Sequence, residues 1–171
     1  MAQYNYAFQK FNPELMARAV ARDIEVSPKQ AIEICNFLRG RKLSSAKALI
    51  EKVIEVKLPV PFKRFTNGLG HRKGKMASGR YPVKASKVFL KLMSSVEANA
   101  QTKGLNTGEL TIIHLCAHRA QTPKHYGRNP GRKFKRSHIE IAVQETPKQE
   151  KGKIQQKPKA EKEKKTVEVK K

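Results

Sequence analysis

The sequence predicts an α+β fold, because three stretches with helical spacing of apolar residues precede two stretches that alternate like β-strands. A length of 171 residues favours a single domain. We place this domain at residues 1–146, with a long β-hairpin at about 111–143. From residue 147 onward the chain is rich in Lys, Glu and Gln and cannot bury enough apolar surface to offset the entropy of ordering. We therefore expect residues 147–171 to form a disordered tail.

The first two helices are expected between Ser27 and residue 57. Ser27 is a candidate N-cap with Pro28 at the first helical position, and Gly40 stands where a C-terminal cap would lie. A second helix is expected over residues 45–57, with Ser44 as its candidate cap.

The third helix is expected to begin at Tyr81-Pro82 and to continue to about Lys103. Lys84, Lys87 and Lys91 mark another face than its apolar stripe, at i, i+3 and i+7 spacing. Such a row is commonly a solvated face. Phosphate contact is the alternative, because an acid-free loop precedes this helix.

Two strands are expected near the end of the domain. Ile113, Leu115 and Ala117 share one face by alternation, and residues 138–143 alternate in the same way. Strands so close in sequence are most simply antiparallel partners. Residues 15–26 are ambiguous, and an edge strand is one interpretation of them.

The charge of the chain indicates a polyanionic partner. The formal net charge is +23, which disfavours a compact isolated state through self-repulsion. Nucleic acid is the first candidate and an anionic membrane surface the second. The chain has no apolar run of the roughly 18–20 residues that span a bilayer, and its first residues lack a secretory signal. We expect a cytoplasmic protein without a membrane partner.

The positive charge is concentrated in two acid-free stretches. Ten Lys or Arg residues and no acid lie between Glu55 and Glu97, and the segment from Ala117 to His138 carries seven more. Lys and Arg contact phosphates, Gly permits close backbone approach, and aromatic rings stack on unpaired bases. No sequence-reading module is recognisable, which favours a folded RNA read by its shape and backbone. The candidate RNA-binding residues are Lys63, Arg64, His71, Arg72, Lys73, Lys75, Arg80, Lys84, Lys87, Arg119, Lys124, Arg128, Arg132, Lys133, Lys135 and Arg136.

Cysteine and histidine residues give little sign of metal chemistry. Cys35 and Cys116 make no disulfide framework, and small core residues in a reducing compartment explain them. His114, Cys116 and His118 face one side of a strand, as a row of metal ligands would, but no fourth ligand is evident. We therefore expect a mixed face turned toward a neighbouring element or RNA, with no metal and no cofactor.

Catalysis is not expected. Paired carboxylates, a nucleophile elbow and a phosphate loop after a strand are all missing. A nuclease or RNA-modifying enzyme using His71, His125 or His138 is the alternative, and it needs an acid or a metal near a histidine. A DNA-compacting protein is a third interpretation, which leaves the long hairpin unexplained. We expect no small-molecule substrate.

The stretches VPFKRFTNGLGHRKG, GRYPVKAS and SHIEIAV resemble the archaeal and eukaryotic branch of the large-subunit ribosomal protein L twenty-two family. The resemblance covers about residues 10–145. It implies three helices packed on a small three-stranded antiparallel sheet, with the third strand near residues 15–26 and the hairpin protruding.

The resemblance also implies a function. It predicts a structural constituent of the large ribosomal subunit that supports assembly and binds several domains of the large-subunit rRNA. The expected partners are neighbouring large-subunit proteins and the nascent polypeptide, since the hairpin tip of this family lines the polypeptide exit tunnel. By position the tip lies within residues 122–131. Its lining residues would be Pro123, Lys124, His125, Tyr126, Gly127, Arg128 and Asn129.

Overall fold

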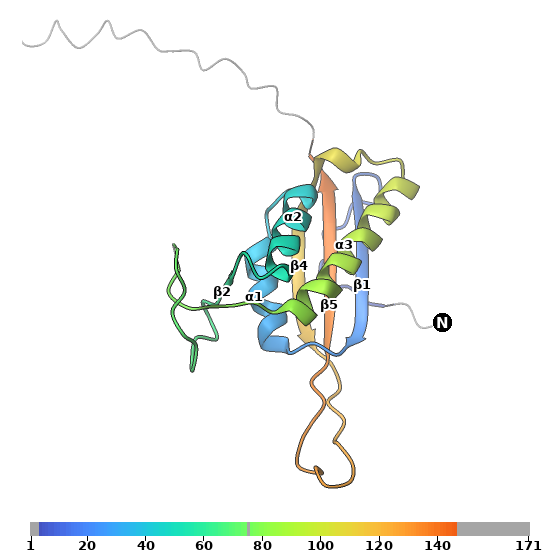
Figure 1. The fold of residues 1–171 in the computed structure, drawn as a ribbon. Helices are drawn as coiled ribbons and strands as arrows, with labels where there is room; N and C mark the ends of the chain where they lie inside the picture. The colour runs from blue at the N-terminus through green and yellow to red at the C-terminus, as the bar shows by residue number, and fades with distance from the viewer. Residues whose placement is uncertain (1–3, 75, 147–171) are drawn as a thin grey trace, which may run out of the picture.

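The structure is a computed structural model, and it describes residues 4–74 and 76–146. This part of the chain combines three α-helices with an antiparallel sheet (Figure 1). The α+β fold class with three α-helices is as predicted. The predicted tail at 147–171 lies outside the described residues. The elements in order are β1 (Met16–Ile24), α1 (Pro28–Leu38), α2 (Leu43–Ile54), β2 (Val60–Pro61), β3 (Gly79–Arg80), α3 (Val83–Thr102), a short 3-10 helix (Thr107–Glu109), β4 (Leu110–Arg119) and β5 (Ser137–Glu145).

The main sheet has the strand order β1-β5-β4, and both pairs are antiparallel. The ambiguous stretch at 15–26 therefore contains an edge strand. The last strand in sequence is central, with Ile141 opposite Ala19 of β1 on one side and Leu115 of β4 on the other. The hairpin strands β4 and β5 pair as expected.

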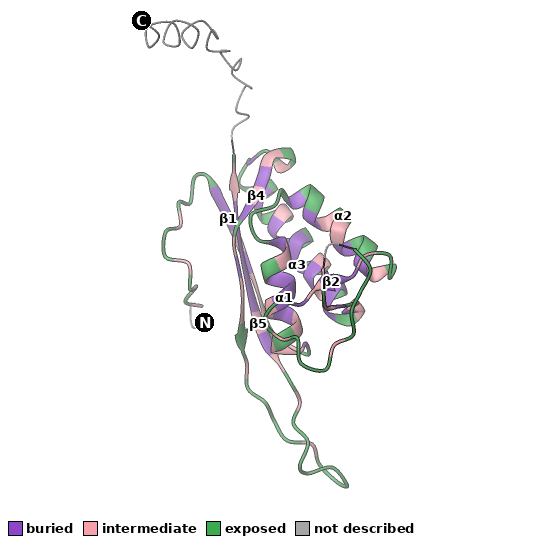
Figure 2. Ribbon diagram, turned by 90° about the vertical axis from the view of Figure 1, so that its left-hand side faces the viewer, coloured by how far each residue is buried: buried purple, intermediate pink, exposed green. Residues whose placement is uncertain are grey.

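All three helices cover one face of this sheet, as the edge-on view shows (Figure 2). Alternate residues of β5, Ile139, Ile141 and Val143, are buried against them together with Phe89 of α3 and Ile34 of α1. Burying a side chain of this size stabilises the fold by about 1.5–3 kcal/mol. The segment before β1 lies along the opposite face, where Tyr4 and Ala7 contact Glu140.

Helix α1 matches its prediction, whereas α2 is displaced toward the N-terminus. It begins at Leu43 with Lys42 as the N-cap residue, so Ser44 is not the cap. Leu43 is buried, and its packing against the core favours the earlier start. The helix ends at Ile54 instead of continuing to residue 57, because Val56 adopts a left-handed conformation with φ 62°.

Strand β4 departs from simple alternation at one residue. A register shift lies between Ile112 and His114, as in a β-bulge. The extra residue, Ile113, is 38% exposed, whereas Ile112 is fully buried and Leu115 resumes the inward direction. The expectation that Ile113 shares the core face of Leu115 and Ala117 is therefore wrong.

Candidate nucleic-acid interface

The basic loop between β2 and β3 is held to the body by a buried carboxylate. Glu33 of α1 is 1% exposed and accepts hydrogen bonds from the backbone N–H groups of Lys63, Arg64 and Phe65, at 3.1, 2.8 and 2.9 Å. The short β2–β3 pair joins the two ends of the loop at its base. The segment is a loop and not a helix, as predicted, and its first residues are fixed in place.

The described candidate cations of this loop are exposed. Among the described residues, none of its exposed candidate cations forms an ion pair with a carboxylate. Their charge is therefore available to an external anion. The exposed candidates are Lys63, Arg64, His71, Arg72, Lys73 and Arg80, while Lys75 lies outside the described residues.

The distal hairpin projects from the end of the sheet and has no core of its own (Figures 1 and 2). The regular strands end at Arg119 and begin again at Ser137, so continuous strands do not fill the predicted span of 111–143. Between them the two arms meet through scattered hydrogen bonds, such as that from His125 N to Arg132 O at 2.9 Å. The exposed cations here are Arg119, Lys124, Arg128, Arg132, Lys133 and Lys135.

The predicted tip is exposed apart from the half-buried His125. The ring of His125 stacks on Phe134, with 3.5 Å between the ring centroids. Tyr126 beside it is 87% exposed, and Gly127 has a φ of 65°, which favours glycine. Pro123, Lys124, Arg128 and Asn129 are exposed as well.

Two basic grooves lie where α1, the loop and the hairpin come together. The larger has a volume of about 460 Å³, and its lining includes Lys29, Arg64, Arg80 and Lys135. The smaller, of about 270 Å³, is lined by Lys29, Lys135 and further hairpin cations. Neither lining contains a carboxylate. Cations distant in sequence therefore converge on one surface, which we call the basic grooves.

Lys29 is the cation of the two groove linings that was not predicted from the sequence. It lies in the first turn of α1, and its ammonium is 5.6 Å from the ring centroid of Phe65. The positive end of the α1 dipole adds to its charge. In the sequence, the one feature that indicates an anion-binding role for Lys29 is its position directly after Pro28, at an expected helix start.

Five of the predicted residues line these grooves, namely Arg64, Arg80, Arg119, Lys133 and Lys135. The two predicted residues of α3 and Arg136 are not part of either lining. Lys84 is paired with Glu25 across 3.3 Å at an exposed site of α3. Lys87 is exposed on the same helix. Arg136 is half-buried, and within the described structure its Nε is buried without a hydrogen-bond partner.

The chain shares its sequence with known proteins over most of its length. Residues 19–144 match the family described as Ribosomal protein L22p/L17e. The chain belongs to this family. The match includes the basic loop, the grooves and the hairpin.

Several archaeal relatives carry the name Large ribosomal subunit protein uL22. The one from Ignicoccus hospitalis is 40% identical over 152 residues, which cover 83% of this chain and 96% of the relative. The Staphylothermus marinus protein is 41% identical and covers 85% of this chain and 99% of its own length. For Picrophilus torridus the identity is 43%, with 82% and 96% covered.

The structure gives little support to the alternative of a histidine-dependent nuclease. Within the described residues, His71 and His125 have no carboxylate within ion-pair distance. His138 lies 4.0 Å from Asp23, and its Nδ1 accepts the backbone N–H of that residue. The acid that such chemistry requires is thus absent from two of the three candidates.

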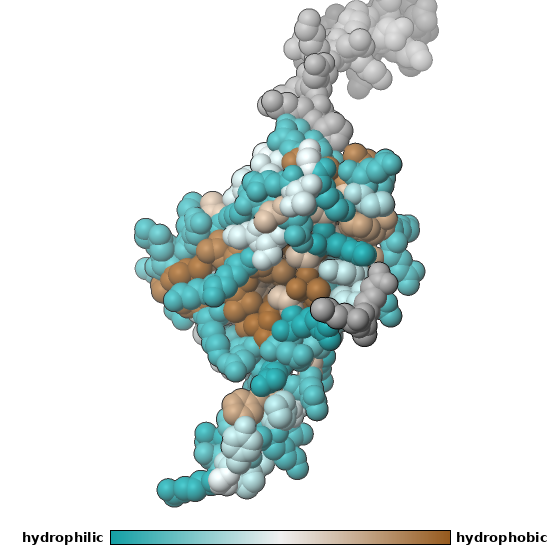
Figure 3. Space-filling model, turned by 90° about the vertical axis from the view of Figure 1, so that its right-hand side faces the viewer, coloured by the Kyte–Doolittle hydropathy of each residue, from teal (hydrophilic) through white to brown (hydrophobic). Residues whose placement is uncertain are grey.

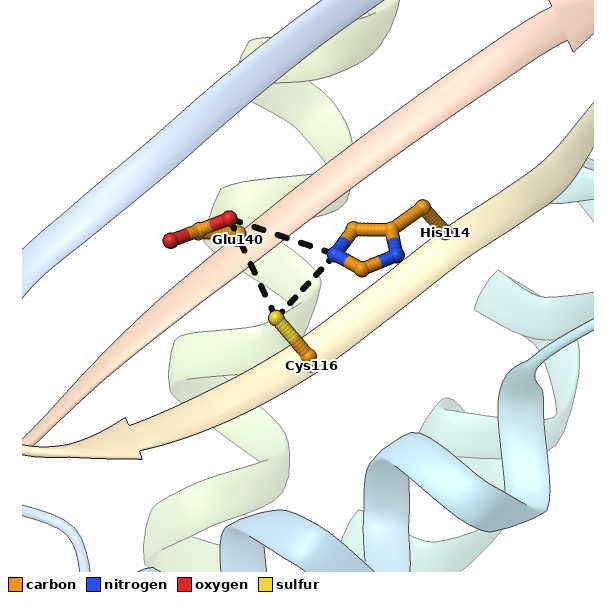
Figure 4. Close-up of side chains that lie close together, drawn as sticks. All are labelled: His114, Cys116 and Glu140. Carbon is orange, nitrogen blue, oxygen red and sulfur yellow. Dashed lines mark hydrogen bonds and ion pairs between the residues drawn. The ribbon is translucent and has the colours of Figure 1, made fainter. Parts of the chain in front are cut away.

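The sheet face away from the helices carries a separate cluster (Figure 4). Sγ of Cys116 lies 3.1 Å from Nε2 of His114 and 3.0 Å from Nε2 of His118, so the three side chains share a face as predicted. Glu140 of β5, which is 2% exposed, lies opposite Cys116 in the sheet. Burial, reinforced by the Glu140 charge, raises the pKa of the Cys116 thiol to about 11.

The described segment before β1, residues 4–15, covers this cluster, and we call it the N-terminal arm. The Tyr4 hydroxyl donates a hydrogen bond of 2.5 Å to Glu140, and the Phe8 ring stacks on His114 with 5.3 Å between centroids. Burial lowers the pKa of His114 although the Glu140 carboxylate acts in the opposite direction. Burial also raises the pKa of Tyr4, and its hydrogen bond to Glu140 adds to the rise.

Proposed function

We propose that this chain is a structural, non-catalytic protein of the large ribosomal subunit that binds the large-subunit rRNA in its basic grooves and along its hairpin. The observation that carries the proposal is the convergence of cations from α1, the loop and the hairpin on grooves without a carboxylate. A surface with several cations binds several phosphates of a nucleic acid. Because the grooves carry positive charges and no carboxylate, they match a polyanion better than a protein partner of mixed charge.

The hairpin supports the same partner. Its distal residues are exposed and lack a core, and an isolated two-stranded ribbon is marginal in water. Surrounding rRNA would supply the missing contacts. On the face that Figure 3 shows, apolar side chains gather on the body, whereas the hairpin is mostly hydrophilic.

The tip extends the proposal to the polypeptide exit tunnel. Tyr126 lies in the predicted tip and is exposed, and the hairpin projects beyond the globular body (Figure 1). With the arms of the hairpin embedded in rRNA, the tip would line the exit tunnel and contact the nascent chain. The body remains outside, where it contacts neighbouring large-subunit proteins, and binding several rRNA domains assists assembly in the cytoplasm.

None of the helices in the described part of the chain combines the length and the apolar character that a membrane crossing requires. The anionic partner that we propose is RNA.

The test is the salt dependence of binding to large-subunit rRNA. The double variant Arg64→Gln/Lys135→Gln removes two groove charges, and the slope of log K against log salt should fall by about 0.7–0.9 for each phosphate that the variant no longer neutralises. The matched control is Lys42→Gln/Lys52→Gln, which removes two exposed charges on or next to α2, outside the groove linings.

Equal slopes for the groove variant and the wild type would refute phosphate binding in the grooves. Sedimentation of the native protein tests the assembly itself. We expect it with large subunits, and its recovery only among free proteins would refute the ribosomal role.

A further inference from the structure

The outer face of the sheet holds a cluster that the proposed RNA interface does not use. Nε2 of His114, Sγ of Cys116 and a carboxylate oxygen of Glu140 all lie within 4.8 Å of one another (Figure 4). We propose that these three side chains bind a Zn²⁺ ion that clamps β4 to β5 beneath the N-terminal arm. None of the three is a candidate RNA-binding residue, so the proposal does not depend on the proposed function.

The separations between the donor atoms suit zinc. At Zn–N, Zn–O and Zn–S lengths of about 2.0–2.3 Å, tetrahedral ligand atoms lie about 3.3–3.6 Å apart. Sγ of Cys116 is 3.1 Å from Nε2 of His114, and Oε2 of Glu140 is 3.9 Å from each of these atoms. Movements of a few tenths of an ångström, within the reach of side-chain rotation, bring all three to ligand distance.

The strand pairing explains why these side chains meet. Cys116 and Glu140 are directly opposed across the antiparallel pair, and His114 is two residues before Cys116 on the same face. The side chains of a cross-strand pair lie close together, and the residue two positions along one strand points to the same face. The three metal-donor atoms therefore lie close to one another. This geometry supplies the additional ligand that the sequence pattern alone did not reveal, since Glu140 lies on another strand.

Groups around the cluster hold the ligands in place. Ala7 N donates to Oε2 of Glu140 at 2.9 Å and the Tyr4 hydroxyl donates to Oε1. A carboxylate has about four acceptor sites, so both hydrogen bonds leave room for a metal bond. His118, 3.0 Å from Sγ of Cys116 and 46% exposed, is placed to donate an N–H to the thiolate. Hydrogen-bonded ligands of this kind are usual around bound metals.

Charge gives a reason for the metal. A carboxylate that is 2% exposed is costly unless it is compensated. On binding, the Cys116 thiol releases its proton to solvent, and the thiolate and the Glu140 carboxylate together neutralise the two charges of Zn²⁺. Nitrogen, sulfur and oxygen donors together favour zinc over magnesium or calcium. Water completes the fourth position.

The test uses Co²⁺ as the probe, added to the full chain purified without a polyhistidine tag and stripped with chelator. One equivalent of Co²⁺ should give visible d–d bands and a near-ultraviolet band from thiolate to cobalt, and Zn²⁺ should displace both. Cys116→Ala should abolish the thiolate band. Substitution of a residue that only hydrogen-bonds a metal ligand typically weakens metal binding by about 10–100-fold. His114→Ala removes a ligand itself, so it should weaken Co²⁺ binding by more than this. Cys35→Ala and His125→Ala are the matched controls and should bind as the wild type does.

Circular dichroism establishes that each variant is folded, and calorimetric titration of the wild type with Zn²⁺ gives an answer that needs no variant. A stoichiometry of one supports the site. Absence of saturable binding would overturn it, leaving the Tyr4 hydroxyl and the Ala7 N–H as the partners of Glu140. A thiolate band that survives Cys116→Ala, or disappears with Cys35→Ala, would also overturn it.

Discussion

Glu33 shows how one buried side chain positions a functional segment. Its two carboxylate oxygens accept three successive N–H groups at the start of the basic loop, in a place where the backbone has no strand partner. Hydrogen bonds to a charged acceptor are stronger than neutral ones. Nothing in the residue pattern indicates this role, because Glu33 is separated from the loop by α2 and resembles an exposed helical glutamate.

The substitution Glu33→Gln tests this anchor. The amide can keep the carbonyl oxygen for Arg64 and Phe65, but its NH₂ group then faces the donor of Lys63. We expect a loss of about 1–3 kcal/mol in the free energy of unfolding, measured by urea denaturation, and faster amide exchange at residues 63–65. Glu51→Gln, an exposed change on α2, is the control and should be neutral. Unchanged exchange in Glu33→Gln would contradict the anchoring role.

The hairpin consists of a proximal part that packs in the core, β4 and β5, and a distal part that is exposed. The β4 and β5 strands carry core residues such as Leu115 and Ile141, whereas residues 121–132 are exposed apart from half-buried His125. Alternation predicted the first half correctly, except at the bulge around Ile113. It could not predict where regular pairing stops, because that point is set by the end of helix cover over the sheet.

Replacing residues 121–132 with a short Gly-Ser linker should therefore leave the body folded. The removed segment contributes no residue to the core. We expect the free energy of unfolding to change by no more than about 0.5 kcal/mol, as for surface substitutions, and the far-ultraviolet circular dichroism to show the helices intact. An unfolded product would mean that the distal hairpin stabilises the domain.

The chain as a unit carries a large excess of positive charge, and few of its described cations are paired with a carboxylate. The formal net charge is +23, and the ion pairs without histidine in the described residues number three, of which two are exposed and Lys47–Glu97 is partly buried. Repulsion between like charges destabilises the compact state, and dissolved salt screens it.

Raising KCl from low to physiological concentration should thus raise the Tm of the isolated protein. At this size, a gain of 1 kcal/mol corresponds to about 2–4 °C. Differential scanning calorimetry over a KCl series measures the effect, with an equal osmolality of sucrose as the control for excluded-solute stabilisation. A Tm that falls with KCl would show that attractive pairs outweigh the repulsion.

The amino-acid order by itself determined the α+β class, the three helices, the antiparallel strand pair and the basic, acid-free stretches. These features depend on local periodicity and composition, which a linear chain displays directly. The tertiary structure decided what depends on distant segments meeting. It brought Lys29 to the grooves, set Glu33 beneath the loop, and placed Glu140 opposite Cys116. Contacts of this kind are set by strand register and helix packing, so spacing along the chain does not encode them.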